Sequence, residues 1–133
     1  MNRTRIAVAI TLLAAVFSLF GCSLFNVEMD QSDSSSIQSL RVGELLIVRL
    51  AGNATTGYEW ARVEPQAFDG SPLEIVQEGN YQADACGLVG APGEFIFRYR
   101  ATSLGTMNLV FEYRQPWEPD HPIETVSVTV WVH

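Results

Sequence analysis

The sequence predicts an all-β fold, and three observations lead to this prediction. From Leu40 to His133, apolar and polar residues alternate with a period of two, which is the spacing of side chains on one face of a strand. Within this region no window keeps helical spacing over several turns. All six prolines lie between the alternating runs, where a missing backbone N–H does not interrupt a sheet ladder.

The alternating runs follow one another along the chain. A short first strand is expected around Leu40 to Val42, and the next runs are 44–51, 58–63 and 73–81. Two aromatic-rich runs follow at 95–100 and 109–113. The last run places four valines on one face: Val126, Val128, Val130 and Val132. About seven strands with turn signals between them are typical of an immunoglobulin-like antiparallel β-sandwich, which is expected to span residues 40–133. The sequence lacks the Cys–Trp–Cys pattern of antibody domains.

Three connections are expected to emerge at the same end of this sandwich. If neighbouring strands alternate in direction, these connections are residues 52–57, 83–93 and 114–122. The connections at the other end, 64–72 and 103–105, read as plain turns. Several loops at one end of a rigid scaffold are a common way to build a binding surface.

The residues before the domain read as an export leader. Asn2 to Arg5 form a short basic start, and the apolar run Ile6 to Phe20 is shorter than the roughly 20 residues that span a bilayer core. Residues 1–21 are therefore predicted to be a signal peptide. Its end, Leu-Phe-Gly-Cys, resembles the lipobox of bacterial lipoproteins, which implies acylation of Cys22. The alternative is ordinary secretion, with Cys22 incidental.

A polar segment separates this leader from the first expected strand. Residues 22–39 are rich in serine and aspartate and lack an apolar period, so they are predicted to be a flexible tether behind the lipidated cysteine. Ser23 stands where an aspartate would, by the sorting rule of such lipoproteins, retain the protein at an inner membrane. A lipid-anchored location in a bacterial cell envelope is expected, with the outer membrane favoured over the inner one.

Composition excludes several functions. Eight arginines stand against fifteen acidic residues, giving a net charge of −7, so no basic face is available for nucleic acid. His121 and His133 are the only histidines, and neither has obvious partners for a metal site or a catalytic triad. Cys86 has no clear basic neighbour and reads as a small buried hydrophobic residue. We expect no enzymatic activity, no metal and no cofactor.

The three connections carry motifs that, in this order, resemble those of the chagasin-like inhibitors of papain-family cysteine peptidases. The first reads Asn-Ala-Thr-Thr-Gly-Tyr from Asn53, where the family has Asn-Pro-Thr-Thr-Gly-Tyr. The second contains Gly-Ala-Pro-Gly from Gly90, and the third reads Arg-Gln-Pro-Trp from Arg114, where the family has Arg-Pro-Trp. The resemblance implies an immunoglobulin-like fold and a papain-family cysteine peptidase as the partner of a monomeric inhibitor.

The resemblance also implies which residues contact the peptidase. Thr56 would lie nearest its catalytic pair, Asn53 and Thr55 would shape the first loop, and Tyr58 would pack beneath it. Trp117 would be an aromatic anchor, while glycines would let the second loop lie along the enzyme surface. The full set is Asn53, Ala54, Thr55, Thr56, Gly57 and Tyr58, then Gly90, Ala91, Pro92 and Gly93, then Arg114, Gln115, Pro116 and Trp117.

Two departures from the family pattern bear on affinity. Ala54 replaces a proline, so the first loop lacks a fixed φ before binding. Gln115 takes the place of the arginine before Pro-Trp, and Arg114, one position early, is expected to point elsewhere. Such an inhibitor would act by reversible occlusion. The alternative from another class is a non-inhibitory adhesion or scaffold lipoprotein that binds a different envelope protein, because the fold alone does not decide function.

Overall fold

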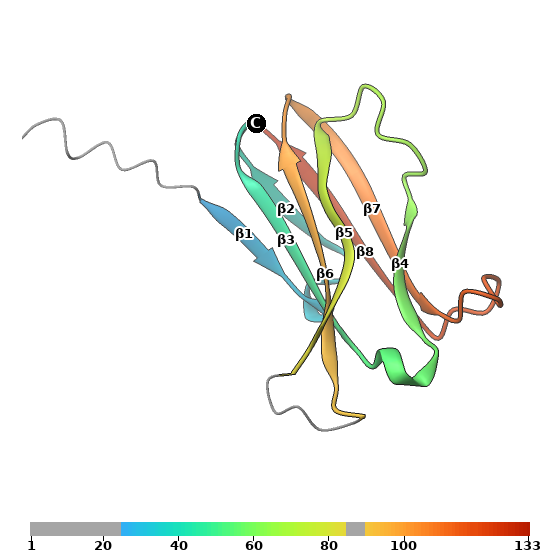
Figure 1. Ribbon diagram of the computed structural model, residues 1–133. Coiled ribbons are helices and arrows are strands. Elements are labelled where there is room, and N and C mark those ends of the chain that lie inside the picture. Colours follow the sequence, from blue (N-terminus) through green and yellow to red (C-terminus); the bar gives the residue numbers. More distant parts are fainter. Residues whose placement is uncertain (1–24, 85–89) are drawn as a thin grey trace, which may run out of the picture.

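The computed structural model describes residues 25–84 and 90–133, which form two β-sheets packed face to face (Figure 1). One sheet has the strand order β1-β3-β6-β5 and the other β2-β8-β7-β4. The strands are β1 (Asn26–Met29), β2 (Ser36–Leu40), β3 (Leu45–Gly52), β4 (Glu59–Glu64), β5 (Leu73–Ala83), β6 (Gly93–Ala101), β7 (Gly105–Arg114) and β8 (Glu124–Val132). The expected all-β, immunoglobulin-like sandwich is confirmed. Within the described ranges, no helix is long and apolar enough to cross a bilayer.

The core lies between the sheets, where the period-two pattern places it. All four valines of β8 that were expected on one face are buried. In the opposite sheet, Phe97 and Tyr99 of β6 are buried, and the Phe97 ring packs on Phe111 of β7 with centroids 4.8 Å apart. All six prolines lie outside the strands, as predicted. The alternating apolar side chains therefore form a continuous layer between the sheets, and their burial fixes the register of the strands.

The expected flexible tether of residues 22–39 is wrong from residue 26 onward, where the chain forms strands and a 3₁₀ turn. Asn26–Met29 pairs with β3, and Ser36–Leu40 pairs with β8, so the domain begins about fifteen residues before Leu40. The strand that was expected to start at Leu40 instead ends there, as β2, and residues 41–44 form a turn. Both pairings are parallel, so the sandwich is not wholly antiparallel, and β1 brings the number of strands in the described residues to one more than the seven expected.

Local hydrogen bonds explain why this polar segment is ordered. Asp30 caps a 3₁₀ turn (η2, Gln31–Asp33), accepting from the backbone N–H of Ser32 at 2.7 Å and from its hydroxyl at 2.6 Å. These bonds hold the pKa of Asp30 below its ordinary value, with the hydroxyl as the larger cause. Met29 and Leu40 are the buried apolar contacts on either side. Backbone pairing and a capping box can order a segment that buries little apolar surface. A search for apolar periodicity does not detect order of this kind.

Strand directions place three connections at one end of the molecule, as expected. Figure 1 shows the ends of β3, β5 and β7, from which these three connections leave, at the lower end, and the β4–β5 and β6–β7 connections at the upper end. We call residues 53–58, 90–92 and 114–123 the rim. We call Phe25 and the turns 41–44 and 102–105 the base. Rim and base lie at opposite ends of the sandwich. The leader and Cys22 fall outside the described residues.

Candidate functional site

Asn53 organises the first rim loop. It caps a 3₁₀ turn (η3, Ala54–Thr56), and its side-chain Oδ1 accepts from the Thr55 backbone N–H at 3.0 Å and from the Thr55 hydroxyl at 2.6 Å. The Thr56 hydroxyl donates back to the Asn53 carbonyl at 2.6 Å. Asn53 and Thr55 therefore shape the loop, as the sequence indicated, while the exposed Thr55 and Thr56 side chains lie at its tip.

Gly57 ends this turn in a conformation that favours glycine. Its φ is +80° and its ψ is 0°, in the left-handed region, and its N–H donates to the Ala54 carbonyl at 3.4 Å. A side chain here would be strained, since a left-handed backbone brings Cβ close to the carbonyl. The chain then turns directly into β4, with Tyr58 half-buried beneath the loop.

A hydrogen bond between described residues ties the second loop to the first. The Asn53 Nδ2 donates to the Gly90 carbonyl at 3.1 Å, and Gly90 has a φ of +84° with open space around it. Ala91 is half-buried and Pro92 is exposed. Residues 85–89, which include Cys86, fall outside the described part of the chain, so the expectation for that thiol stays a prediction.

Gly93 differs from its expected place on the enzyme-facing surface. It is buried at the start of β6, where it pairs with Gly52 of β3 and Ala83 of β5. A Cβ at this position would lie 2.4 Å from the Gln82 carbonyl oxygen and 2.6 Å from the Tyr81 hydroxyl. Gly93 therefore supports the end of the second loop from inside the sheet, because only a glycine lets the β5 backbone approach so closely.

The third loop touches the first through Trp117. The indole lies over Gly57, where an added Cβ would be 3.0 Å from Cη2 of the ring, and 65% of Trp117 is exposed. Pro116 beside it is exposed and Gln115 is half-buried. The rim thus brings together the three positions that the sequence singled out in separate loops, namely Thr56, Gly90 and Trp117.

Arg114 points into its own loop, as expected. Its guanidinium Nη1 donates to the Pro119 carbonyl at 3.0 Å and pairs with the Glu112 carboxylate at 3.2 Å. The Glu118 N–H donates to the Gln115 carbonyl at 3.0 Å, closing the turn that carries Trp117. Arg114 therefore supports the loop from within, because Glu112 and Pro119 belong to the same hairpin.

Beneath the rim lies an aromatic cluster, of which the sequence analysis assigned only Tyr58 to the site. Tyr113, the residue before Arg114, packs on Trp60 with ring centroids 5.2 Å apart and on Tyr58 at 5.5 Å. Its hydroxyl accepts from the Asn53 N–H at 3.0 Å. Phe95, beside the second loop, meets Tyr113 edge-on at 6.5 Å. The sequence signal that could have identified Tyr113 was its position, since it is the last inward-facing residue of its strand before a rim loop.

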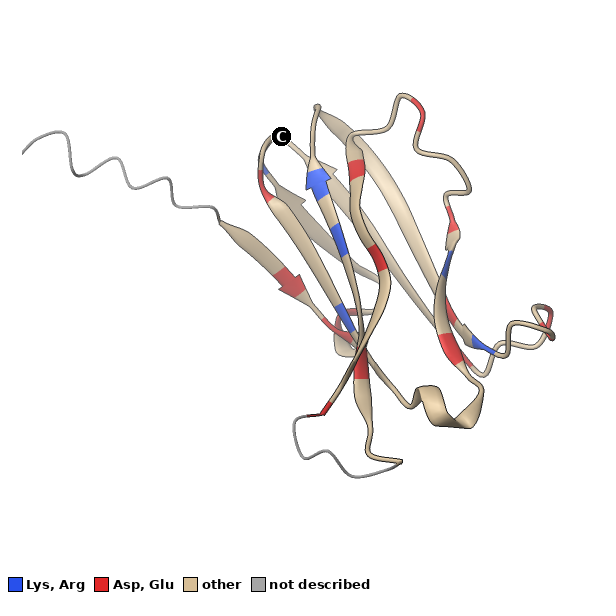
Figure 2. Cartoon of the chain, in the orientation of Figure 1, with Lys and Arg blue, Asp and Glu red and all other residues tan. Residues whose placement is uncertain are grey.

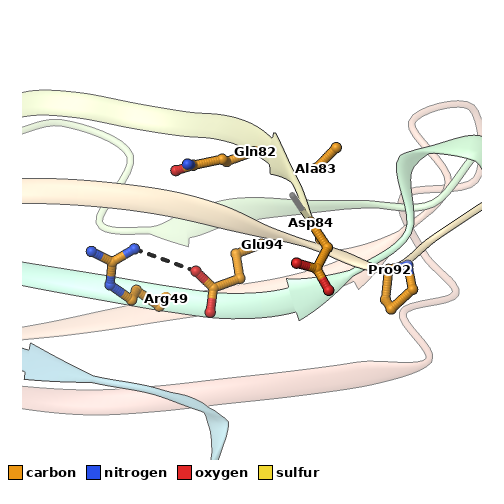
Figure 3. Close-up of a pocket in the computed structure, with 7 residues that line it drawn as sticks. Arg49, Gln82, Ala83, Asp84, Pro92 and Glu94 are labelled. Carbon is orange, nitrogen blue, oxygen red and sulfur yellow. Dashed lines mark hydrogen bonds and ion pairs between the residues drawn. The ribbon is translucent and has the colours of Figure 1, made fainter. Parts of the chain in front are cut away.

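A shallow hollow of ≈ 560 Å³ lies beside the second loop, between the ends of β3, β5 and β6 (Figure 3). Its polar lining includes Arg49, Asp84 and Glu94, and Arg49 pairs with Glu94 at 3.3 Å. Figure 2 shows acidic and basic residues at scattered positions along the strands and connections of both sheets. The described residues contain no group of three or more His, Cys, Asp or Glu side chains that could hold a metal ion.

Replacing Asn53 with alanine is expected to destabilise the domain by about 1–2 kcal/mol, because the Oδ1 acceptor of the 3₁₀ turn and the donor to Gly90 are both lost. Asn53→Asp is the matched control, since it keeps the acceptor and removes only the donor. Urea unfolding measures stability, and amide exchange at Gly90 and Ala91 reports the link between the loops. Equal stability of the two variants would contradict the capping role.

Comparison with known proteins identifies the family. The model of the chagasin family of peptidase inhibitors I42 matches residues 39–130. Amoebiasin-1 of Entamoeba histolytica is 25% identical over 104 residues, covering 78% of this chain and 97% of the relative. Chagasin of Trypanosoma cruzi is 29% identical over 108 residues, covering 76% of this chain and 93% of chagasin.

Solved structures agree on the fold. The cysteine protease inhibitor EhICP2 of Entamoeba histolytica superposes with a TM-score of 0.70 at 21% identity, covering 81% of this chain and 96% of that one. PbICP-C, solved in complex with falcipain-2, gives a TM-score of 0.52 at 24% identity, covering 82% of this chain and 90% of that one. With its three loop motifs gathered on one rim and the family model matched over most of its length, this chain belongs to the chagasin family of peptidase inhibitors.

Proposed function

We propose that this chain is a reversible, occluding inhibitor of papain-family cysteine peptidases, and that it enters the active-site cleft with the rim. Family membership and the similarity to chagasin support this. The observation that carries it is the first loop, which is capped by Asn53, linked to Gly90 on one side and covered by Trp117 on the other. A loop that is ordered before binding loses less conformational entropy in the complex.

The hydrogen bonds inside the loop also explain how it resists cleavage. The Asn53 carbonyl accepts from both the hydroxyl and the N–H of Thr56, and the Ala54 carbonyl accepts from Gly57. These carbonyls are turned toward the loop, so they are not presented to a thiolate nucleophile and an oxyanion hole in the geometry that acyl transfer needs. A peptidase would therefore hold the loop without cutting it.

We assign the binding roles by position on the rim. Thr55 and Thr56 would enter the cleft beside the catalytic thiolate, since they are exposed at the tip of the 3₁₀ turn. Trp117 would be the apolar anchor, and the backbone around Gly90 and Pro92 would lie along the enzyme surface. The complex should bury a standard interface of roughly 1,600 Å² in total.

The proposal is tested with a fluorogenic substrate, papain and the purified domain. The expected result is inhibition that reverses on dilution, with the domain intact by mass spectrometry afterwards, while a serine peptidase such as trypsin works at full rate. The control is the Trp117→Ala protein at the same concentration. An absence of inhibition at micromolar concentration, or steady cleavage of the domain, would overturn the proposal and favour the adhesion or scaffold alternative.

Replacing Ala54 with proline is expected to tighten inhibition about 2–5-fold. Ala54 is the first residue of the 3₁₀ turn, where proline fits, and Asn53 before it is already extended at φ −131° and ψ 104°. Proline would restrict the unbound loop and stabilise the domain by about 0.4–1 kcal/mol. Inhibition constants and thermal unfolding measure both effects. Ala91→Pro in the second loop is a control for proline as such, and weaker inhibition by Ala54→Pro would contradict the pre-organised loop.

We further propose that Cys22 is acylated and anchors the inhibitor in a bacterial cell envelope, at the outer membrane by preference. The basic start, the apolar run and the Leu-Phe-Gly-Cys sequence support this. Membrane fractionation and mass spectrometry of the N-terminal peptide test it. A diacylglyceryl-modified Cys22 is the expected species. A chain that is recovered unmodified in the soluble secreted fraction would contradict it.

A further inference from the structure

The base of the sandwich carries three large apolar side chains that the core does not use. Phe25 is 61% exposed, Val42 is 51% exposed and Leu104 is 71% exposed. Val42 lies in the turn between β2 and β3, and Leu104 lies in the turn between β6 and β7, where polar residues are usual. Exposed apolar side chains gathered at one end of a domain mark a surface that is covered in use.

Backbone bonds hold these three residues at the same end. The Gly43 N–H donates to the Ala101 carbonyl at 2.8 Å, which joins the turn of Val42 to the strand that leads to Leu104. Asn26 is in register with Leu45, so Phe25 lies beside the start of β3, directly after the Val42 turn. Figure 1 shows the start of β1 and both turns toward the upper end, away from the three rim loops.

Charge does not oppose contact between this end and a lipid surface. The Glu44 carboxylate accepts from the Arg41 N–H at 2.8 Å, and the Glu74 carboxylate pairs with Arg100 at 3.6 Å. The two arginines balance the two carboxylates next to the apolar residues. This end therefore carries two arginines and two glutamates near its apolar residues, with Arg100 and Glu74 paired, which suits the boundary between headgroups and acyl chains.

The position of Cys22 in the sequence indicates that a lipid bilayer covers the base. Cys22 precedes Phe25 by three residues, and three residues of chain reach at most about 11 Å. The first strand begins at Asn26, so β1 and β2 lie where a tether was expected. A lipid on Cys22 would therefore hold Phe25 close to the membrane surface, and the two turns lie at the same end.

We propose that the base docks on the bilayer interface through Phe25, Val42 and Leu104, so that the rim is held pointing away from the membrane. This inference rests on the proposed anchor at Cys22, and it goes beyond inhibition by stating how the inhibitor is oriented. A peptidase that approaches the envelope from the surrounding compartment would then meet the three loops first.

The experiment uses the acylated full chain, reconstituted into vesicles of phosphatidylethanolamine and phosphatidylglycerol. With Cys86→Ser as background, an environment-sensitive fluorophore is placed on Ser103→Cys in the base or on Glu118→Cys in the rim; both positions are exposed. Lipids with a nitroxide near the headgroup serve as the quencher. We expect roughly five-fold more quenching at position 103 than at position 118, because the docked base lies within the interfacial layer.

A second protein separates docking from mere proximity. It carries Phe25→Ser, Val42→Ser and Leu104→Ser together with the probe at 103, and its folding is checked by unchanged inhibition of papain. Quenching at 103 should fall to the level seen at 118, although the vesicles still carry the protein on flotation. Quenching that persists in this variant, or equal quenching at 103 and 118 in the parent, overturns the proposal.

Other occupants of the base give distinct results. A second copy of this chain would shift the emission of the probe at 103 with protein concentration in detergent, before any vesicles are added, and this overturns membrane docking. Protein that does not float with vesicles overturns the docking and the anchor together. Inhibition of papain is measured on the samples labelled at 103, away from the rim, so a failure of docking or of the anchor is distinguished from a failure of the proposed inhibition.

Discussion

Trp117→Ala is expected to weaken inhibition of papain at least about 30-fold, which corresponds to about 2 kcal/mol of binding free energy. The indole is 65% exposed on the rim, and its inner edge lies over Gly57. Its truncation removes the largest apolar side chain that the rim offers to a partner. It also uncovers the residue that ends the first loop, so the loop loses a neighbour before the peptidase arrives.

Trp131→Ala is the matched control for this substitution. Trp131 is also a half-exposed tryptophan, at 49%, but it lies in β8 in register with Ser39 and Thr106, near the base. Inhibition constants for the two variants, with unfolding curves for both, separate a binding effect from a stability effect. Equal loss of inhibition in both variants, or an unchanged constant for Trp117→Ala, would contradict the assignment of the rim as the binding surface.

The strands and the end at which the loops emerge could be predicted from the sequence, because both follow from local rules. Alternation in the last run predicted the buried face of β8, and the prolines marked the connections. Once the strands alternate in direction, every second connection lies at the same end. This reasoning placed Thr56, Gly90 and Trp117 on one rim without any knowledge of their contacts.

The contacts between the loops could not be predicted in this way, because they depend on backbone geometry. The bond from Asn53 to Gly90 needs a side chain that caps one turn and also reaches a second loop. Gly93 has the same residue type as Gly90, yet one is buried under Tyr81 and the other is exposed. A glycine in a loop motif can serve a positive φ, a close backbone approach or a contact with a partner, and only the fold shows which of these applies.

The order in the supposed tether escaped prediction for a related reason. β1 and β2 are short and polar, and they join the sheets at their edges through parallel backbone pairing. Composition indicates how much apolar surface a segment can bury. An edge strand is instead ordered by backbone hydrogen bonds to a neighbouring strand that is itself held by the core. The consequence reaches function, because a domain that starts at about residue 26 is held much closer to Cys22 than one that starts at residue 40.

Gly57→Pro is expected to abolish inhibition, with a loss of about 100-fold or more, while the sandwich still folds. Proline fixes φ near −65°, whereas Gly57 has a φ of +80°, so the first loop cannot keep its shape. The N–H that donates to the Ala54 carbonyl is also removed, and the ring would push against Trp117. The loop lies outside the core, so the loss of stability should stay within about 1–3 kcal/mol.

Gly70→Pro is the control for strain as such. Gly70 has a similar φ of +70°, no neighbour within 4 Å of an added Cβ, and a place in the β4–β5 connection at the end opposite the rim. Both variants suffer the same conflict of backbone angle, but only one changes the loop that Asn53, Gly90 and Trp117 hold together. If Gly70→Pro inhibits as poorly as Gly57→Pro, general destabilisation accounts for the loss, and the shape of the first loop does not control binding.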